Sequence, residues 1–333
     1  MKNQNSMFKA GTVSLATIVL SAAVATTAVA TEWPHDRTTF IVSHGVGSSQ
    51  NQTTRVLGEI WKEYLGTNFV YDARGGSSGR IGYDFFQRQP SDGSFLLSSN
   101  VGSASIMYAQ QNPDWNWRET LTPIGMYAVD PGVIFVNTNS EFQTFDDVIE
   151  AAKERSLTMA ISFWASPENL QLHQIMDATG AQFDIIPIGS SDEVITQMLG
   201  GHYDVGYQKV ATVDRAGDNL RAIAVPLAVN PVPNMTNNAP TVDEVIGVNT
   251  MGIASYRVIL AHKEWADANP ELVELLQSTL NQALRDERLI EEMGRIGVPA
   301  DLIYNLTTEE IYEQILDRYW DAFDRFGNIY SQG

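Results

Sequence analysis

The chain has 333 residues, of which 21 are Lys or Arg and 40 are Asp or Glu, so its formal net charge is -19. This acidity argues against nucleic acids and anionic membrane surfaces as partners, because both would be repelled. The chain contains no Cys, so no disulfide supports its fold. A hydrophobic content of 44% over this length suits two α/β domains, each with its own core, better than one large core.

Residues 1–30 have the pattern of a secretory signal peptide. Lys2 and Lys9 flank the start of an apolar stretch that ends at the small residues Ala28-Val29-Ala30, a site of the kind that signal peptidase cuts. A membrane anchor is the alternative, but Ser and Thr dilute the stretch. Cleavage after residue 30 would leave 19 basic and 40 acidic residues, a net charge of -21. We therefore predict an exported protein.

After this segment, short apolar runs alternate with amphipathic helical patterns. The predicted strands are residues 39–42, 68–71, 95–97, 133–136, 158–161, 183–186, 204–207 and 222–225. This alternation predicts mostly parallel sheets flanked by helices. Ligands of such sheets bind at the carboxyl ends of strands, where helix N-termini point. Residues 270–285, 289–296 and 308–326 are helical patterns without strands between them, and we expect them to pack back on an earlier domain.

Local signals mark where several helices begin and end. Residues 52–65 carry apolar side chains at the spacing of one helix face. Thr144 with Asp147 three residues later predicts a capping box. Ser166-Pro167 predicts an N-cap followed by a first-turn proline, and Thr179-Gly180 predicts the end of that helix.

Three Gly/Ser loops join predicted strands to predicted helices. They are "SHGVGSSQN" at residues 43–51, "GGSSG" at residues 75–79 and "SFWAS" at residues 162–166. Backbone N–H groups and hydroxyls beside a helix N-terminus suit a carboxylate or a phosphate. Neither the glycine pattern of dinucleotide-binding loops nor the Walker pattern of nucleotide-binding loops is present. A single Gly/Ser loop between a strand and a helix is usually only a turn. Three such loops at corresponding ends of the predicted strands indicate a site that binds an anion.

The second loop also matches G-x-S-x-G, with Ser77 in the place of a hydrolase nucleophile. A secreted serine hydrolase is therefore the alternative function, and it requires a His and an acid near that hydroxyl. The five histidines, His35, His44, His173, His202 and His262, show neither a triad context nor the spacing of metal ligands. We predict no metal site and no cofactor.

The order of these segments resembles the periplasmic solute-binding receptors of tripartite tricarboxylate transporters, the Bug or TctC type. The resemblance rests on six motifs that follow one another in the family's order: "IVSHGVGSSQN", "DARGGSSGRIG", "SDGSFLL", "SFWASPENL", "GGHYD" and "PTVDE". The match covers essentially the whole chain after residue 30. No single motif is specific, but six in order are.

The resemblance implies a type II, Venus-flytrap fold with two mostly parallel α/β lobes and a hinge. Lobe one would comprise residues 31–132 and 249–333, and lobe two residues 133–248. The implied function is non-enzymatic: a periplasmic monomer captures a small di- or tricarboxylic or aromatic acid and delivers it to the permease subunits. A ligand sensor for a signalling receptor is an alternative that sequence does not separate from transport.

In the family, the first and third loops hold the ligand carboxylate, often through water. Carried over to this chain, the ligand-binding residues of lobe one are Ser43, His44, Gly45, Val46, Gly47, Ser48, Ser49, Gly79, Asn100 and Ser103. Those of lobe two are Ser162, Phe163, Trp164, Ala165, Ser166, Asp204 and Gln208. For Asp204, sheet packing is an equally good interpretation.

The chain departs from the family at several of these positions. Where the family usually has Pro-Phe in the first loop, this chain has Ser43-His44, and Asn51 stands in place of the family's usual acid. In the third loop, Phe163, beside Trp164, replaces the family's glycine. Two aromatic residues indicate either a smaller pocket or stacking on a flat ligand. Arg74 and Arg257 are spare candidates for a second carboxylate, although we expect each to form a structural ion pair.

Overall fold

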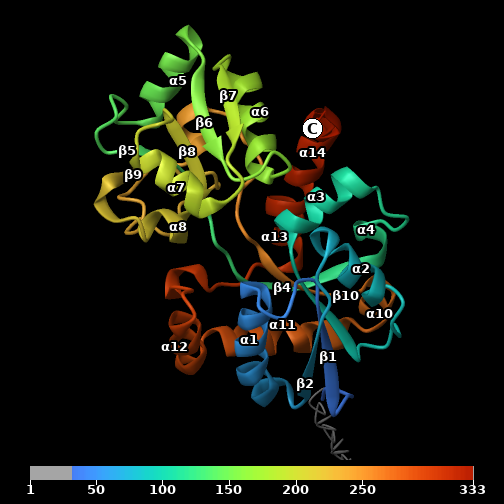
Figure 1. The fold of residues 1–333 in the computed structure, drawn as a ribbon. Coiled ribbons are helices and arrows are strands. Elements are labelled where there is room, and N and C mark those ends of the chain that lie inside the picture. Colours follow the sequence, from blue (N-terminus) through green and yellow to red (C-terminus); the bar gives the residue numbers. More distant parts are fainter. Residues whose placement is uncertain (1–31, 333) are drawn as a thin grey trace, which may run out of the picture. The chain divides into compact units, whose positions relative to one another are not determined.

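Two five-stranded sheets organise the computed structural model, which describes residues 32–332 (Figure 1). In spatial order, the first sheet contains β2 (Asn68–Ala73), β1 (Arg37–Val42), β3 (Phe95–Asn100), β10 (Arg257–His262) and β4 (Leu121–Ala128). The second contains β7 (Phe183–Pro187), β6 (Leu157–Ile161), β8 (Val205–Lys209), β5 (Gly132–Asn137) and β9 (Leu220–Ala224). β10 and β5 run antiparallel to both of their neighbours. The prediction of mostly parallel sheets is confirmed, with one reversed strand in each.

We call the first sheet and its helices the first lobe. These helices are α1 (Ser49–Leu65), α2 (Arg80–Phe86), α3 (Val101–Gln111), α4 (Trp117–Thr120), α10 (Lys263–Ala268), α11 (Pro270–Leu284), α12 (Glu287–Arg295) and α13 (Thr308–Ile311). α1 lies beside α11 and α12 although more than 200 residues separate them (Figure 1). The fully buried Trp61 ties this pair together, because its Nε1 donates to Thr279 Oγ1 at 2.9 Å.

The second sheet and its helices form the second lobe. Its helices are α5 (Phe145–Glu154), α6 (Pro167–Thr179), α7 (Ser191–Leu199), α8 (Val210–Asp214) and α9 (Val242–Ile246). The predicted capping box of Thr144 and Asp147 begins α5, and Ser166 caps α6, which ends at the left-handed Gly180. These local predictions are confirmed.

The structure has two strands that the sequence patterns did not indicate, β4 and β10. β4 contains Pro123 and Gly125, residue types that are depleted in strands. β10 follows a long excursion through the second lobe and pairs between β3 and β4. Its place in the first sheet is therefore set by long-range pairing and not by a local strand–helix unit.

Two neighbouring segments cross between the two sheets and form the hinge. The chain leaves the first sheet after β4 and returns just before β10, and the two crossings pair as a short antiparallel ribbon. Asp130 N donates to Ser255 O at 3.2 Å, Ser255 N donates to Asp130 O at 2.8 Å, and Pro131 bridges Ala254. Any change in the angle between the lobes must bend this ribbon.

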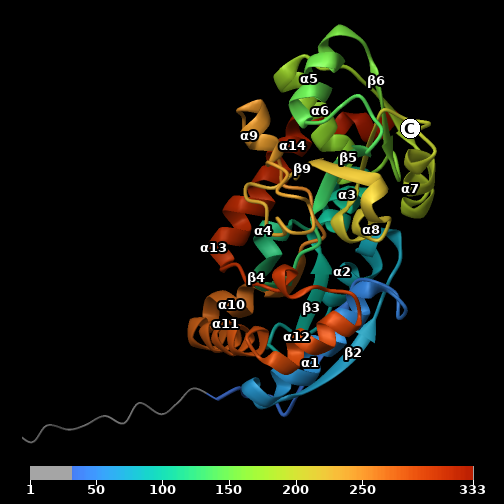
Figure 2. The same cartoon turned by 90° about the vertical axis from the view of Figure 1, so that its left-hand side faces the viewer.

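The C-terminal helices contact both lobes. α13 lies beside β4, a π-helical turn follows at Tyr312–Leu316, and α14 (Asp317–Phe326) lies beside α6 of the second lobe (Figure 2). A final 3₁₀ segment, Gly327–Gln332, ends the described chain. The predicted boundaries at residues 132 and 248 stay a prediction, and assigning the whole tail to lobe one does not account for the contact between α14 and α6.

Candidate functional site

The first loop follows β1 and leads into the N-terminus of α1. Ser48 caps this helix: its Oγ accepts from Asn51 N at 3.2 Å and donates to Gly45 O at 2.7 Å. A Cβ added at Gly45 or Gly47 would meet no atom within 4 Å, so this backbone is open. Because the first N–H groups of a helix have no partner in the helix, the loop presents backbone donors beside a positive helix end.

The departure at Asn51 adds another donor in the first turn of α1. Asn51 is buried, its Oδ1 accepts from Arg55 Nε at 3.0 Å, and its Nδ2 has no partner among the described residues. An acid here would oppose an anion, whereas an amide N–H favours one.

The second loop supports the first from behind. A Cβ at Gly75 would lie 2.4 Å from Gly45 N. Gly79 has φ +96°, and a Cβ there would lie 3.4 Å from Ser43 O. This glycine run is therefore needed for close packing. Ser77 has φ +49° and its carbonyl accepts from Gln111 Nε2. No histidine in the described part of the chain hydrogen-bonds to Ser77, so the arrangement of a hydrolase triad is not found there.

His44 joins the first loop to the N-terminus of α3. Its Nδ1 lies 3.2 Å from the Oγ of the buried Ser43, and its Nε2 lies 3.4 Å from Ser103 Oγ. Asn100 caps α3 by accepting from Gly102 N and Ser103 N. Burial, followed by the charge of Arg257, lowers the pKa of His44. The imidazole is therefore neutral near pH 7 and contributes hydrogen bonds without a charge.

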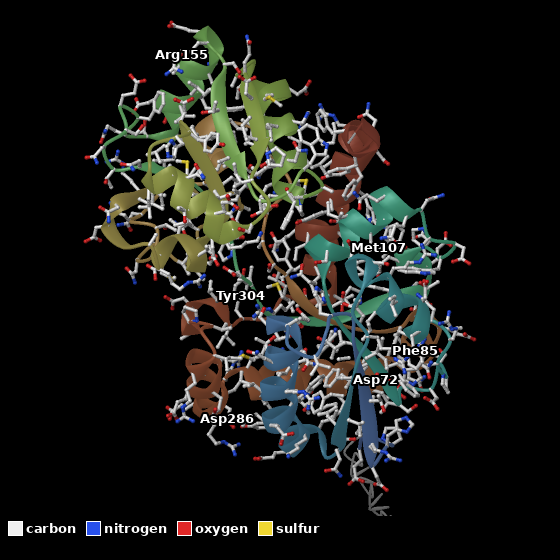
Figure 3. All side chains as sticks on the ribbon, in the orientation of Figure 1. Asp72, Phe85, Met107, Arg155, Asp286 and Tyr304 are labelled. Atoms are coloured by element: carbon white, nitrogen blue, oxygen red, sulfur yellow. The ribbon has the colours of Figure 1, made fainter. Side chains whose placement is uncertain are left out.

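The two candidate arginines differ. Arg74 forms the expected ion pair with Asp72 at 2.9 Å and lies over the ring of Phe85. Figure 3 labels these two partners, Asp72 and Phe85. Arg257 is only 6% exposed and donates from Nη2 to Ser49 Oγ at 3.0 Å. Within residues 32–332 no carboxylate forms an ion pair with it. The expectation of an ion pair is confirmed for Arg74 and wrong for Arg257.

In the second lobe, Ser162 and Gln208 form one polar cluster at the carboxyl ends of β6 and β8. Gln208 Nε2 donates to Ser162 Oγ at 2.8 Å, and Ser191 Oγ lies 3.1 Å from the same hydroxyl. Ser166 caps α6 by accepting from Asn169 N, although at 3.4 Å. All of these groups are uncharged.

The two aromatic residues of the third loop lie in different environments. Phe163 is 56% exposed. Trp164 donates from Nε1 to Ile329 O at 3.3 Å and lines a surface hollow between α6 and β7, with His173 and Phe183 among its other lining residues. Phe163 is therefore the aromatic side chain that is free to contact a ligand, whereas Trp164 holds the C-terminal segment. The half-buried Ala165 packs against the hydrophobic core.

Asp204 lies apart from the other predicted residues. It precedes β8, whereas Gln208 is near the other end of that strand. Its Oδ2 accepts from both the N and Oγ1 of Thr158, each at 2.8 Å. Asp204 thus joins β8 to β6 at their amino ends, and we leave it out of the proposed site.

The N-termini of α3 and α6 meet beside the hinge. A Cβ at Gly102 would lie 3.5 Å from Ala254 O and 3.6 Å from Pro167 Cγ. Pro167 is the first residue of α6, so this contact brings helix ends from both lobes together. The first-lobe cluster around His44 and Arg257 and the second-lobe loops therefore converge at the hinge.

Sequence reasoning missed three charged residues in this region. Lys209 Nζ donates to Glu168 Oε1 at 2.9 Å, and both side chains are largely buried. Burial raises the pKa of Glu168, but the charge and hydrogen bond of Lys209 outweigh it and the pKa is lowered. Burial raises the pKa of Asp130, although Lys209 and Arg257 act against this. In the sequence these are single charged residues near the end of a predicted strand, near the start of a predicted helix or between the lobes. Their role cannot be inferred until the structure shows which residues they contact.

Two features of the described residues bear on other functions. No group of three or more His, Cys, Asp or Glu in residues 32–332 is placed to hold a metal ion. None of the helices in that range is long and apolar enough to cross a membrane.

Comparison with known proteins shows the family. BugT of Bordetella pertussis is 25% identical over 286 residues, which cover 84% of this chain and 86% of BugT. A TctC solute-binding protein from Polaromonas, solved without ligand, has a TM-score of 0.78 at 17% identity over 90% of this chain and 99% of that chain. A Rhodopseudomonas palustris protein solved with adipate has a TM-score of 0.59 at 19% identity, covering 90% and 98% of the two chains.

These structural likenesses show the two-lobed fold of periplasmic binding proteins. Residues 53–314 match the family described as "Tripartite tricarboxylate transporter family receptor". The chain therefore belongs to the receptor family of the tripartite tricarboxylate transporters.

Proposed function

We propose that the protein is a periplasmic receptor that captures a small carboxylate between its lobes and delivers it to the permease of a tripartite tricarboxylate transporter. The observation that carries this proposal is the convergence of helix N-termini beside the hinge: α1 and α3 come from the first lobe and α6 from the second. Such ends bind anions through their free N–H groups and the helix dipole.

Family membership supports the same function. The family is one of solute-binding receptors and not of enzymes, and its R. palustris structural neighbour was solved with adipate. The predicted signal peptide fits delivery to the periplasm, although residues 1–30 lie outside the described residues. A carboxylate ligand, a permease partner and a monomeric state are our proposals for this chain.

The mechanism follows from the hinge ribbon around Asp130 and Ser255. Ligand would first bind the first loop and the N-terminus of α3, where Arg257 supplies positive charge. Closure would bring up the polar cluster of Ser162 and Gln208 and exclude water, which strengthens every hydrogen bond to the ligand. The permease would then recognise the closed form.

Thermal-shift titration of the protein recovered from the periplasm tests this function. We expect the melting temperature to rise with the concentration of one class among dicarboxylates, tricarboxylates, aromatic acids and amino acids, since a ligand that binds only the folded state stabilises it. Sugars and polyamines serve as controls. Stabilisation by a control class and by no carboxylate would contradict the proposal, after mass spectrometry has excluded a carboxylate retained from purification.

A further inference from the structure

Arg257 lies between the ends of two helices that point at the proposed site. It is the first residue of β10, where it pairs with Asn100, the cap of α3. Its Nη2 donates to Ser49 Oγ, in the first residue of α1. The guanidinium is thus held at the N-terminus of α1, and the backbone of Arg257 lies beside the cap of α3, so an anion placed there meets a full charge and the positive end of α1.

This buried cation has no counterion within the described protein. A guanidinium has five N–H donors, and for Arg257 one hydrogen bond to another described side chain is found. Burial raises the pKa of Asp130, and the charge of Arg257 acts against this without forming an ion pair. Burying an unpaired charge is costly, and a bound carboxylate would remove that cost through a bidentate contact.

Among the described residues, the second lobe offers no corresponding buried and unpaired charge. Two of its cations act on Asp130: Lys209 is already paired with Glu168 at 2.9 Å, and Arg215 is exposed. Glu168 is in the first turn of α6, so it also offsets the positive end of that helix. The remaining groups are the neutral Ser162, Ser191 and Gln208. Glu168 therefore lies close to any carboxylate bound at the N-terminus of α6, so this helix end favours a second anion less than the ends of α1 and α3 do.

We propose that Arg257 selects the ligand by binding one carboxylate, and that the opposite end of the ligand is an uncharged hydrogen-bonding group such as a hydroxyl or an amide. This inference rests on the proposed receptor function and narrows its ligand class to monocarboxylates with a polar tail. Gln208 and Ser162 both donate and accept, so they match a hydroxyl or an amide better than an anion.

Matched acid pairs test the charge preference. Isothermal titration would compare succinate with succinamate, glutarate with glutaramate, adipate with adipamate, and terephthalate with 4-carbamoylbenzoate. In each pair one carboxylate is replaced by an amide of nearly the same shape. We expect the monoamide to bind about tenfold tighter or more in the pair of the right length, which corresponds to about 1.4 kcal/mol.

Two variants assign the preference to residues. Arg257→Gln should abolish binding of both members of the pair, whereas Arg257→Lys, which keeps the charge but loses the fork, should retain weakened binding. Glu168→Gln releases the charge of Lys209, and we expect it to reverse the preference toward the dicarboxylate. Circular dichroism and melting temperatures check that each variant is folded.

The outcomes separate the two proposals. If a dicarboxylate binds as tightly as its monoamide, or if Arg257→Gln binds like the wild type, the assignment to Arg257 is overturned while the receptor function stands. If no member of any pair binds while another carboxylate raises the melting temperature, this inference is overturned and the receptor function stands; if only a control class raises it, both fall.

Discussion

The hydroxyl of Tyr330 donates a 2.7 Å hydrogen bond to the carbonyl of Ser166 across 164 residues of sequence. Ser166 is the cap of α6, and the adjoining Ile329 carbonyl accepts from Trp164. The C-terminal segment therefore contacts the third loop through two hydrogen bonds, one to the carbonyl of Ser166 and one from the indole of Trp164. It makes the geometry of a proposed ligand loop depend on the last residues of the described chain.

Removing this bond should weaken both folding and binding. We expect Tyr330→Phe to lower the free energy of unfolding by about 1 kcal/mol, since the Ser166 carbonyl loses a buried donor, and to weaken carboxylate binding because the third loop loosens. Tyr64→Phe is the matched control: its hydroxyl donates to Asp286 Oδ2 on the surface, so it should change stability little. Equal effects of the two changes on affinity would argue against a role for the C-terminal segment.

The second loop should tolerate no side chain at Gly75. Because a Cβ there would lie 2.4 Å from Gly45 N, Gly75→Ala must displace the first loop, and we expect a loss of about 1–3 kcal/mol of stability with weakened ligand binding. Gly294→Ala in α12 is the control, since its Cβ meets nothing within 4 Å and Ala favours the helix. Urea denaturation measures both, and a Gly75→Ala variant as stable as wild type would show that the loops are not in contact.

Local units of the fold could be predicted from sequence because their signals are local. The capping box of Thr144, the cap at Ser166 and most strands of the parallel units are read from neighbouring residues. β10 could not be predicted in this way, since its position depends on a return from the second lobe. The sheet order therefore required the structure.

The candidate site divides along the same line. The first loop and the cap of α6 are local features that could be predicted, whereas the cap of α1 at Ser48 was not predicted. Arg257 has no carboxylate partner among the described residues, and this depends on every carboxylate that the fold brings near it. Asp204 is the opposite case, in which the motif resembles the family's but the structure does not bring the residue to the site. Its carboxylate accepts hydrogen bonds from Thr158 at the amino end of β8, away from the candidate site.

Loss of the two site caps should affect binding beyond the cost of losing a cap. Ser48→Ala and Ser166→Ala each remove an acceptor for a first-turn N–H, and we expect each to reduce stability by about 1 kcal/mol and to weaken carboxylate binding by about 1 kcal/mol or more. Thr144→Ala removes the cap of α5, so it should reduce stability but leave affinity unchanged. Unchanged affinity in both serine variants would remove these loops from the site.

The hinge residue Asp130 predicts how stability changes with pH. Its Oδ1 has no partner among the described residues, and burial raises its pKa. Because the folded pKa is above that of the unfolded chain, the stability that this group contributes is fully present below the ordinary Asp pKa and is lost as pH rises through the raised one. Ionised Asp130 therefore destabilises the fold at neutral pH.

Asp130→Asn cannot ionise and should keep the contact with the backbone N–H of Ala211. We expect it to melt higher than the wild type at pH 7, with the difference closing as pH falls below about 4, where the wild-type carboxyl is protonated in both states. Asp147→Asn provides the opposite sign, since hydrogen bonds from Gln143 and Thr144 lower the pKa of Asp147. That variant should be less stable than wild type at pH 7, and the deficit should shrink as pH falls through the lowered pKa. Melting curves from pH 3 to pH 8 would measure both differences, and a constant difference for Asp130→Asn across this range would show that its ionisation is not coupled to folding.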